Sequence, residues 1–126
     1  MKTINIPTHS DSRRQLIEVL GQYQINEPVK HLYFSIINPN NSVANHYHKK
    51  KKEWICILQG KARITVDKES EIITEPKLIE IPPNTWHLIE NIDNHNPVYL
   101  LGIGNQPYNP NEPDIFVKGE IKSESN

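Results

Sequence analysis

Short segments rich in β-branched and aromatic residues recur roughly every eight to ten positions along the chain, separated by clusters of Pro, Asn, Gly and charged residues. This spacing predicts strands at 29–37, 43–48, 53–58, 61–66, 71–74, 78–81, 85–91 and 98–103, with residues 67–70 as a hairpin loop. Alanine occurs only twice and isoleucine is abundant, which also favours pleated structure. The pattern indicates an all-β sandwich or small barrel rather than a fold in which strands alternate with helices.

The two ends of the chain are less regular than its middle. Residues 1–10 are consistent with a lead-in or with an edge strand through Ile4 and Ile6. Residues 13–20 fit a short helix or a strand equally well. The polar segment 117–126 lacks the apolar residues that would hold it on a core, and we expect it to be disordered. A length of 126 residues fits one domain.

Charge and cysteine usage exclude several classes of protein. Lys and Arg number 14 and Asp and Glu number 15, so the formal net charge is −1. This balance argues against nucleic-acid binding by bulk charge and against a polybasic membrane-surface protein. A single cysteine, Cys56, rules out an internal disulfide framework, and we expect it to be a buried, inert thiol. With no signal-peptide core and no run of about 20 apolar residues, we expect a cytoplasmic protein.

Three histidines and one glutamate carry the clearest chemical signal. His46 and His48 are two positions apart, so on a strand both imidazoles lie on one face. Glu53 follows at the start of the next predicted strand, and His87 lies in a later one. If the fold brings these four side chains together, they suit one divalent ion per chain, which could be Zn²⁺, Fe²⁺, Mn²⁺ or Ni²⁺.

Two stretches resemble the sequence motifs of the cupin superfamily. His46-x-His48-x4-Glu53-x6-Gly60 is similar to the first motif, and Pro82-x-Asn84-x2-His87-x3-Asn91 is similar to the second. Asn84 stands where cupins usually carry glycine, and asparagine tolerates the positive φ of such a turn. The resemblance covers about residues 29–105. It implies a single-domain cupin jelly-roll β-barrel in which His46, His48, Glu53 and His87 bind a metal.

On this resemblance the chain divides into three parts. We expect residues 1–28 to form a lead-in with edge strands, available for exchange between subunits, residues 29–116 to form the barrel, and residues 117–126 to form the tail. Small cupins commonly pair through edge strands, so the resemblance also implies a homodimer.

A second resemblance concerns the subfamily. Asp11–Leu20, Asn45–Lys49 followed by Glu53-Trp54, and Pro107–Asp114 are similar to segments of cupins that act on nucleotide-linked deoxysugars. That group includes sugar ketoisomerases, the cupin half of capsular-polysaccharide reductases, and small metal-binding cupins of O-antigen clusters. One departure stands out: this chain has Ala44-Asn45 where those sugar enzymes usually carry Arg-Gly before the first histidine.

Tyr33, His31 and Tyr99 are the candidates for a general acid or base. Tyr33 and His31 share one face of their predicted strand with Ser35. This polar face either lines the cavity or meets solvent.

The lysine run 49–52 is interpreted as a solvated hairpin tip or an edge-strand guard, with attraction of a diphosphate as the alternative. Trp54 and Trp86 are interpreted as packing residues or as part of a dimer surface.

Three functions remain open from the sequence. The first is a metal-dependent isomerase or epimerase acting on a keto-sugar, free or nucleotide-linked, or a similar small oxygenated metabolite, by Lewis-acid activation of a carbonyl. The second is an Fe(II)-dependent dioxygenase that uses the same four ligands. The third is a non-catalytic module that binds a sugar or another metabolite. In all three the partner is a small molecule, and neither nucleic acid nor a membrane is expected.

Overall fold

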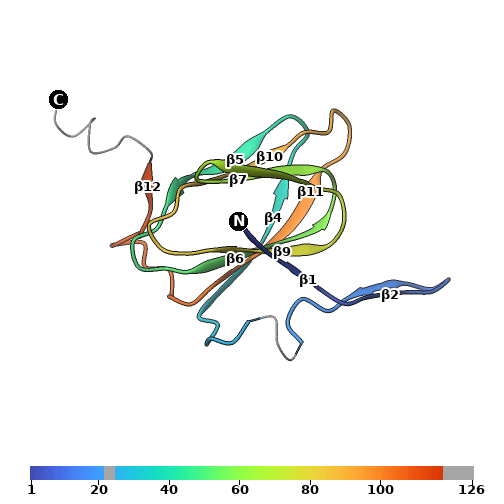
Figure 1. Ribbon diagram of the computed structural model, residues 1–126, viewed down its shortest axis with the longest axis horizontal. Coiled ribbons are helices and arrows are strands. Elements are labelled where there is room, and N and C mark those ends of the chain that lie inside the picture. The colour runs from blue at the N-terminus through green and yellow to red at the C-terminus, as the bar shows by residue number, and fades with distance from the viewer. Residues whose placement is uncertain (22–24, 118–126) are drawn as a thin grey trace.

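The protein is a jelly roll of two facing antiparallel sheets. The computed structural model describes residues 1–21 and 25–117, and all the regular structure in this part of the chain is strand (Figure 1). The first sheet contains, in spatial order, β1 (Lys2–Asn5), β9 (Lys77–Ile81), β6 (Glu53–Gln59), β11 (Val98–Gly104) and β4 (His31–Ile37). The second contains β12 (Phe116–Val117), β5 (Ser42–Tyr47), β10 (His87–Asn91), β7 (Ala62–Val66) and β8 (Glu69–Ile73). The expected all-β class is confirmed.

Isoleucine fills the space between the sheets. Ile55, Ile57, Ile64 and Ile79 are completely buried there, together with Leu100 at 1% exposure. Isoleucine has few rotamers to lose on a pleated surface and packs well against the facing sheet. The isoleucine-rich composition therefore serves this core.

A second apolar cluster lies on the outer face of the first sheet. Trp54, Cys56, Leu78 and Ile103 are buried there, and Ile6 of the N-terminal segment packs against them. β6 is thus buried on both faces, which explains its almost unbroken apolar sequence. Cys56 is a buried thiol as expected, and burial raises its pKa to about 12.

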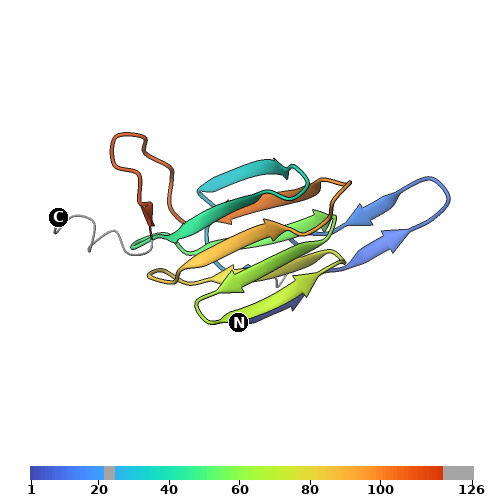
Figure 2. The same cartoon turned by 90° about the horizontal axis from the view of Figure 1, so that it is seen from above.

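The structure settles the ambiguous N-terminal segments. β1 pairs with β9 at the edge of the first sheet, as the edge-strand interpretation expected. Residues 13–20 contain a strand and no helix: β3 (Gln15–Ile17) forms a hairpin with β2 (Thr8–Ser10) that projects beyond the sandwich (Figure 2).

Two expected boundaries were wrong. The predicted hairpin loop at residues 67–70 is shorter, because Glu69 and Ser70 already belong to β8. Asp67 has a φ of 54°, which allows the tight two-residue turn. Val117, the expected first residue of the tail, pairs with His46 in β12, and the rest of that tail lies outside the described residues.

β4 has its polar face inward and its apolar face outward. Leu32, Phe34 and Ile36 are 61%, 55% and 53% exposed, whereas Tyr33 and Ser35 line a cavity inside the sandwich. Of the two orientations left open by the sequence, the cavity-lining one is correct. In residues 1–21 and 25–117, no helix is long and apolar enough to cross a membrane.

Substitution of Ile57 tests the core between the sheets. Ile57→Ala removes a fully buried side chain and leaves a cavity, so we expect a loss of about 2–5 kcal/mol in the free energy of unfolding. Ile72→Ala is the matched control, because Ile72 is 52% exposed and its truncation should cost only about 0.5 kcal/mol. Urea unfolding measures both variants. Equal midpoints would contradict this placement of the core.

Candidate metal centre

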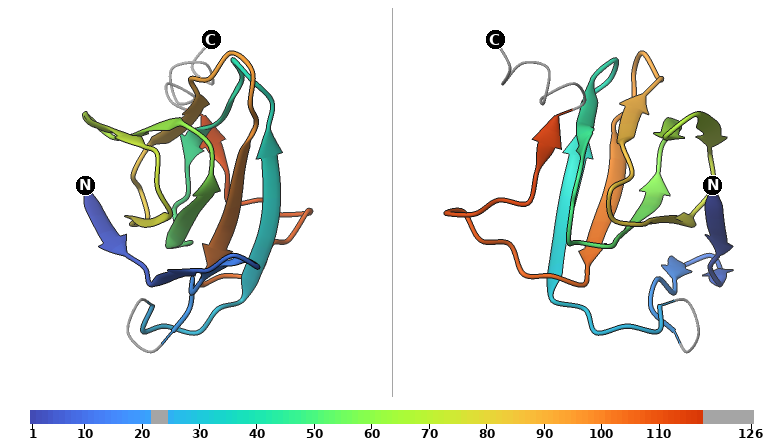
Figure 3. Two further views of the ribbon diagram at one scale, coloured as in Figure 1. Left: turned by 90° about the vertical axis from the view of Figure 1, so that its right-hand side faces the viewer. Right: turned by 60° about the vertical axis from the view of Figure 1, so that its left-hand side comes forward.

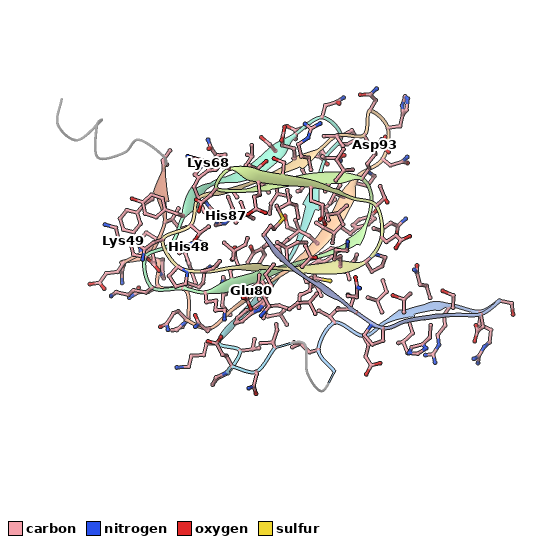
Figure 4. All side chains as sticks on the ribbon, in the orientation of Figure 1. His48, Lys49, Lys68, Glu80, His87 and Asp93 are labelled. Atoms are coloured by element: carbon pink, nitrogen blue, oxygen red, sulfur yellow. The ribbon has the colours of Figure 1, made fainter. Side chains whose placement is uncertain are left out.

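Three imidazoles converge inside one end of the sandwich. His46 lies in β5, His48 directly follows that strand, and His87 begins the neighbouring strand β10. One ring nitrogen from each lies within 4.8 Å of the other two. Figure 4 shows His48 and His87 at the end of the sandwich that faces β12. The predicted grouping of the three histidines is thus present in the structure.

An irregularity in β5 brings His46 opposite His87. The pairing of β5 with β10 shifts by one residue at this point, so that Asn45 is skipped. Ala44 and Asn45 have φ values of 72° and 59°, which an L-residue adopts only at a cost. Such bulges re-aim side chains next to functional sites. Asn84, in the loop before His87, has a φ of 60°, as expected for a residue that stands in place of glycine.

Backbone carbonyls fix the orientation of two of the rings. His48 Nδ1 is 2.5 Å from the carbonyl oxygen of Asp114, and His87 Nδ1 is 3.1 Å from that of Thr85. Since a carbonyl oxygen only accepts, each Nδ1 donates, and in the neutral form of the ring Nε2 then carries the lone pair. Both Nε2 atoms are buried and without a hydrogen-bond partner. This is the arrangement in which protein imidazoles bind metals.

Glu53 supplies a carboxylate from the opposite sheet. Its Oε1 lies 3.5 Å from His87 Nε2 and 3.7 Å from His48 Nε2. Ligands about 2.1 Å from a tetrahedral ion lie roughly 3.4 Å apart, so these separations fit a shared cation. A shared proton or a cation would satisfy the three atoms, which lie too close together for unscreened lone pairs. The three histidines could thus hold a metal ion, and the Glu53 carboxylate lies beside them.

The other carboxylate oxygen of Glu53 is held by protein donors. Lys51 Nζ and the Tyr33 hydroxyl each lie 3.2 Å from Oε2. Burial by itself would raise the pKa of Glu53, but His48, His87 and the Lys51 ammonium hold it well below its usual value. Burial, reinforced by His87 and His48, lowers the pKa of His46 to about 4. At neutral pH the site thus offers an ionised carboxylate and a neutral His46, as metal binding requires.

Two of the three acid–base candidates lie beside this cluster. Tyr33 points inward, and burial together with the neighbouring Glu53 raises its pKa above the usual value. His31 lies next to Tyr33, with ring centroids 5.2 Å apart, and stacks on Tyr108. Its Nδ1 is buried without a hydrogen-bond partner, and burial, followed by the charge of Lys51, lowers its pKa.

Tyr99 is not part of the site. It stacks on Phe34, which belongs to the outer face of the first sheet, with ring centroids 6.0 Å apart. The adjacent Leu100 points inward and lines the cavity, so alternation along β11 turns Tyr99 outward. The expectation that Tyr99 serves as an acid or base was wrong.

The interpretation of the lysine run was also wrong in part. Lys51 is only 8% exposed and reaches the interior, while Lys52 forms ion pairs with Glu27 and Glu80. Lys49 lies over the ring of Phe116. Lys51 and Lys52 are therefore anchored, whereas Lys49 and Lys50 stay exposed, and a role of the run in attracting a diphosphate stays a prediction.

Two glycines of β11 leave space for the inward-pointing side chains of Tyr33 and Lys51. A Cβ at Gly102 would overlap the ring of Tyr33, and a Cβ at Gly104 would lie 2.8 Å from Lys51 Cδ. Gly102 lies within the predicted strand 98–103 and Gly104 directly follows it, so this Gly-x-Gly spacing is a sequence signal for side chains that cross the strand closely. Close approach of other side chains is a common reason for glycine inside a strand.

A cavity of about 190 Å³ adjoins the cluster between the two sheets. It is lined by Tyr33, Ser35, Val43, Ala44, His46, Glu53, Ile89 and Leu100. A larger cavity of about 610 Å³, which Trp86 helps to line, contains none of the four candidate ligands. Of these two, only the smaller cavity is lined by candidate ligands, namely His46 and Glu53. Trp54 is a packing residue as expected, at 1% exposure.

A family model of the cupin domain matches residues 33–104, more than half of the chain. The chain belongs to the cupin family. This cupin is 32% identical over 82 residues to MJ1618, an uncharacterized protein of Methanocaldococcus jannaschii. It is 35% identical over 66 residues to the mannose-1-phosphate guanylyltransferase RfbM of Salmonella typhimurium. These matches cover 65% and 52% of this cupin, and 65% and 13% of the two relatives, so it spans less than two thirds of either.

Solved structures share the fold along nearly the whole cupin. A 3,4-ketoisomerase from Helicobacter canadensis superposes with a TM-score of 0.78 at 20% identity, covering 99% of this chain and 97% of its own. The sugar 3,4-ketoisomerase QdtA from Thermoanaerobacterium thermosaccharolyticum, in complex with TDP, gives 0.76 at 19% identity, covering 98% and 92%. CapF, a capsular polysaccharide assembling protein of Staphylococcus aureus, gives 0.65 at 21% identity, covering 90% of this cupin and 34% of CapF.

Removal of His87 tests the metal centre directly. His87→Ala deletes one buried ligand, so we expect the metal content of the purified protein to fall by at least about 10- to 100-fold. His95→Ala is the control, because His95 is exposed in the loop before β11. Elemental analysis of freshly purified protein measures both. Equal metal content in the two variants would contradict the site.

Substitution of Gly102 tests the position of the Tyr33 ring. Gly102→Ala places a methyl group against the rigid Tyr33 ring, so we expect displacement of that ring and a loss of about 1–3 kcal/mol in stability. Gly104→Ala meets the flexible stem of Lys51 instead and should cost less. Urea unfolding compares the two variants. A larger loss of stability for Gly104→Ala than for Gly102→Ala would contradict the placement of the Tyr33 ring against Gly102.

Proposed function

We propose that this cupin is a metal-dependent isomerase that moves a proton between adjacent carbons of a keto-sugar. The observation that supports it is the convergence of His48 Nε2, His87 Nε2 and Glu53 Oε1 beside a cavity that also holds Tyr33. The fold that it shares with sugar 3,4-ketoisomerases along nearly the whole chain supports the same reaction class. The homodimer and the cytoplasmic location stay predictions from the sequence.

His46, His48, Glu53 and His87 would hold the ion, with nitrogen and oxygen donors that suit Zn²⁺, Fe²⁺, Mn²⁺ or Ni²⁺. A divalent ion bound there supplies Lewis-acid polarisation of a substrate carbonyl. Because Lys51 and Tyr33 occupy Glu53 Oε2, only Oε1 is free to face the ion.

The proton transfer is assigned to His31 and Tyr33. His31 stays neutral near pH 7 because its pKa is lowered, so it can take the proton from the carbon that bears the hydroxyl next to the carbonyl. Tyr33 stays protonated because its pKa is raised, so its O–H can turn from Glu53 Oε2 to the substrate oxygen that becomes negative, while Lys51 keeps its contact with Oε2.

The proton then returns to the former carbonyl carbon. One carbon–hydrogen bond breaks and one forms, while the hydroxyl proton moves to the other oxygen. Ketone and hydroxyl thus exchange places without any net oxidation, and no redox partner is needed.

Incubation of the metal-loaded protein with TDP-4-keto-6-deoxyglucose in D₂O tests the proposal. This compound is the ligand named for a mutant form of QdtA. We expect a rearranged keto-sugar, with solvent deuterium at the carbon that receives the proton, observed by proton NMR. The product should vanish when the metal is removed and return when it is added back.

Three outcomes would contradict the isomerase. Turnover that survives complete removal of the metal would exclude metal dependence. Oxygen uptake by the iron-loaded protein would identify a dioxygenase. Tight binding of keto-sugars without chemical change over long incubation would identify a non-catalytic module.

Tyr33→Phe tests the assigned acid. The substitution removes only the hydroxyl, so we expect kcat to fall by about 10²- to 10⁴-fold with unchanged metal content. Tyr99→Phe removes the same group from the outer face and should leave kcat unchanged. Steady-state kinetics on both variants, beside elemental analysis, make the comparison. An equal effect of the two substitutions would contradict the role of Tyr33.

A further inference from the structure

The chain that follows β11 folds back over the end of the sandwich that holds the histidines. We call residues 105–117 the C-terminal strap. Figure 3 shows the strap leaving β11, running away from the sandwich and returning beside β5, where Phe116 pairs with Tyr47. Between the strap and the residues beneath it, among them His48 and Lys51, a cavity of only about 30 Å³ remains. The strap therefore closes this end of the site.

One residue of the strap, Asp114, holds the loop formed by residues 48–51 through four hydrogen bonds. Its carbonyl oxygen accepts from His48 Nδ1 at 2.5 Å. Its carboxylate accepts from the backbone N–H groups of three successive residues, Lys49, Lys50 and Lys51, at 2.8, 2.8 and 2.9 Å. A charged acceptor shared by three backbone donors makes stronger hydrogen bonds than neutral pairs do.

His48 and His87 differ in where their support comes from. The carbonyl that fixes His87 belongs to Thr85, two residues away in the same segment. The carbonyl that fixes His48 lies 66 positions further along the chain. The orientation of His48 thus depends on the position of the strap, whereas that of His87 does not.

The same loop carries a second contact to the metal centre. Asp114 holds the backbone of Lys51, and the side chain of Lys51 reaches Glu53 Oε2 at 3.2 Å through the space left by Gly104. Asp114 is therefore one contact away from His48 and two contacts away from Glu53. These two ligands come from different sheets.

We propose that Asp114 is a positioning residue for the metal centre, which fixes His48 with Nε2 turned toward the ion and sets the loop from which Lys51 orients Glu53. The proposal rests on the proposed metal site. Groups that orient a ligating histidine typically change metal affinity by about 10- to 100-fold when they are lost.

The test compares Asp114→Ala with Glu112→Ala, which removes an exposed carboxylate from the same strap. For Asp114→Ala we expect the affinity for Zn²⁺, measured by competition with a chromophoric chelator, to fall by about 10- to 100-fold. Glu112→Ala should bind Zn²⁺ as the unaltered protein does. Asp114→Asn keeps one acceptor oxygen and should lose less affinity than Asp114→Ala.

Imidazole ¹⁵N NMR of the metal-free protein gives a second readout, with His87 as an internal reference. In the unaltered protein both rings should carry their proton on Nδ1. In Asp114→Ala we expect His48 alone to lose this preference, while His87 keeps it because Thr85 is unaffected. If Asp114→Ala does not fold, Asp114→Asn serves for both measurements.

The proposal is overturned if Zn²⁺ affinity and the His48 tautomer are both unchanged in Asp114→Ala. It is equally overturned if both His48 and His87 lose their preference for the proton on Nδ1. That result would mean that the substitution disturbs the whole histidine cluster and not His48 alone. If the unaltered protein binds no divalent ion, the proposed function fails, and the NMR comparison still decides whether Asp114 positions His48.

Discussion

A buried carboxylate organises this end of the molecule. Glu53 is 2% exposed, and an ionised carboxylate in such a place is tolerated only when it is paired and hydrogen-bonded. Its two oxygens have separate surroundings: Oε2 meets Lys51 and Tyr33, whereas Oε1 faces the Nε2 atoms of His48 and His87. The first oxygen is satisfied by the protein alone. The second lies beside the histidine group that could hold a metal ion.

Two residues with positive φ and two glycines make this arrangement possible. Ala44 and Asn45 adopt positive φ so that His46 can lie opposite His87, and Gly102 and Gly104 leave space for Tyr33 and Lys51. Local strain of this kind, of order 1–3 kcal/mol per residue, persists only where the surrounding structure fixes it. Here the surroundings are two sheets with a close-packed isoleucine core. The regular part of the jelly roll thus stabilises the irregular part that carries the chemistry.

The sequence predicted the features that depend on local periodicity. Strand spacing indicated the architecture, and the two-residue period placed His46 and His48 on one face. It failed where direction depends on distant neighbours. Tyr99 points outward, where it stacks on Phe34 of β4, and Lys51 points inward because Gly104 on another strand leaves it space. A run of four lysines contains no information about which of them is buried, since the burial of Lys51 depends on Gly104, a residue far along the chain.

The two ends of the site differ in the space that they leave. The strap leaves about 30 Å³ on the side of His48 and Lys51, while the cavity beside Tyr33 and His46 has about 190 Å³. On the proposed function, a substrate therefore meets the ion from the side of β4 and β5. Pockets that enclose a drug-sized ligand span about 300–1,000 Å³, so this cavity admits only the reacting part of a nucleotide-sugar. On the proposed function, the nucleotide of such a substrate would therefore lie outside the sandwich.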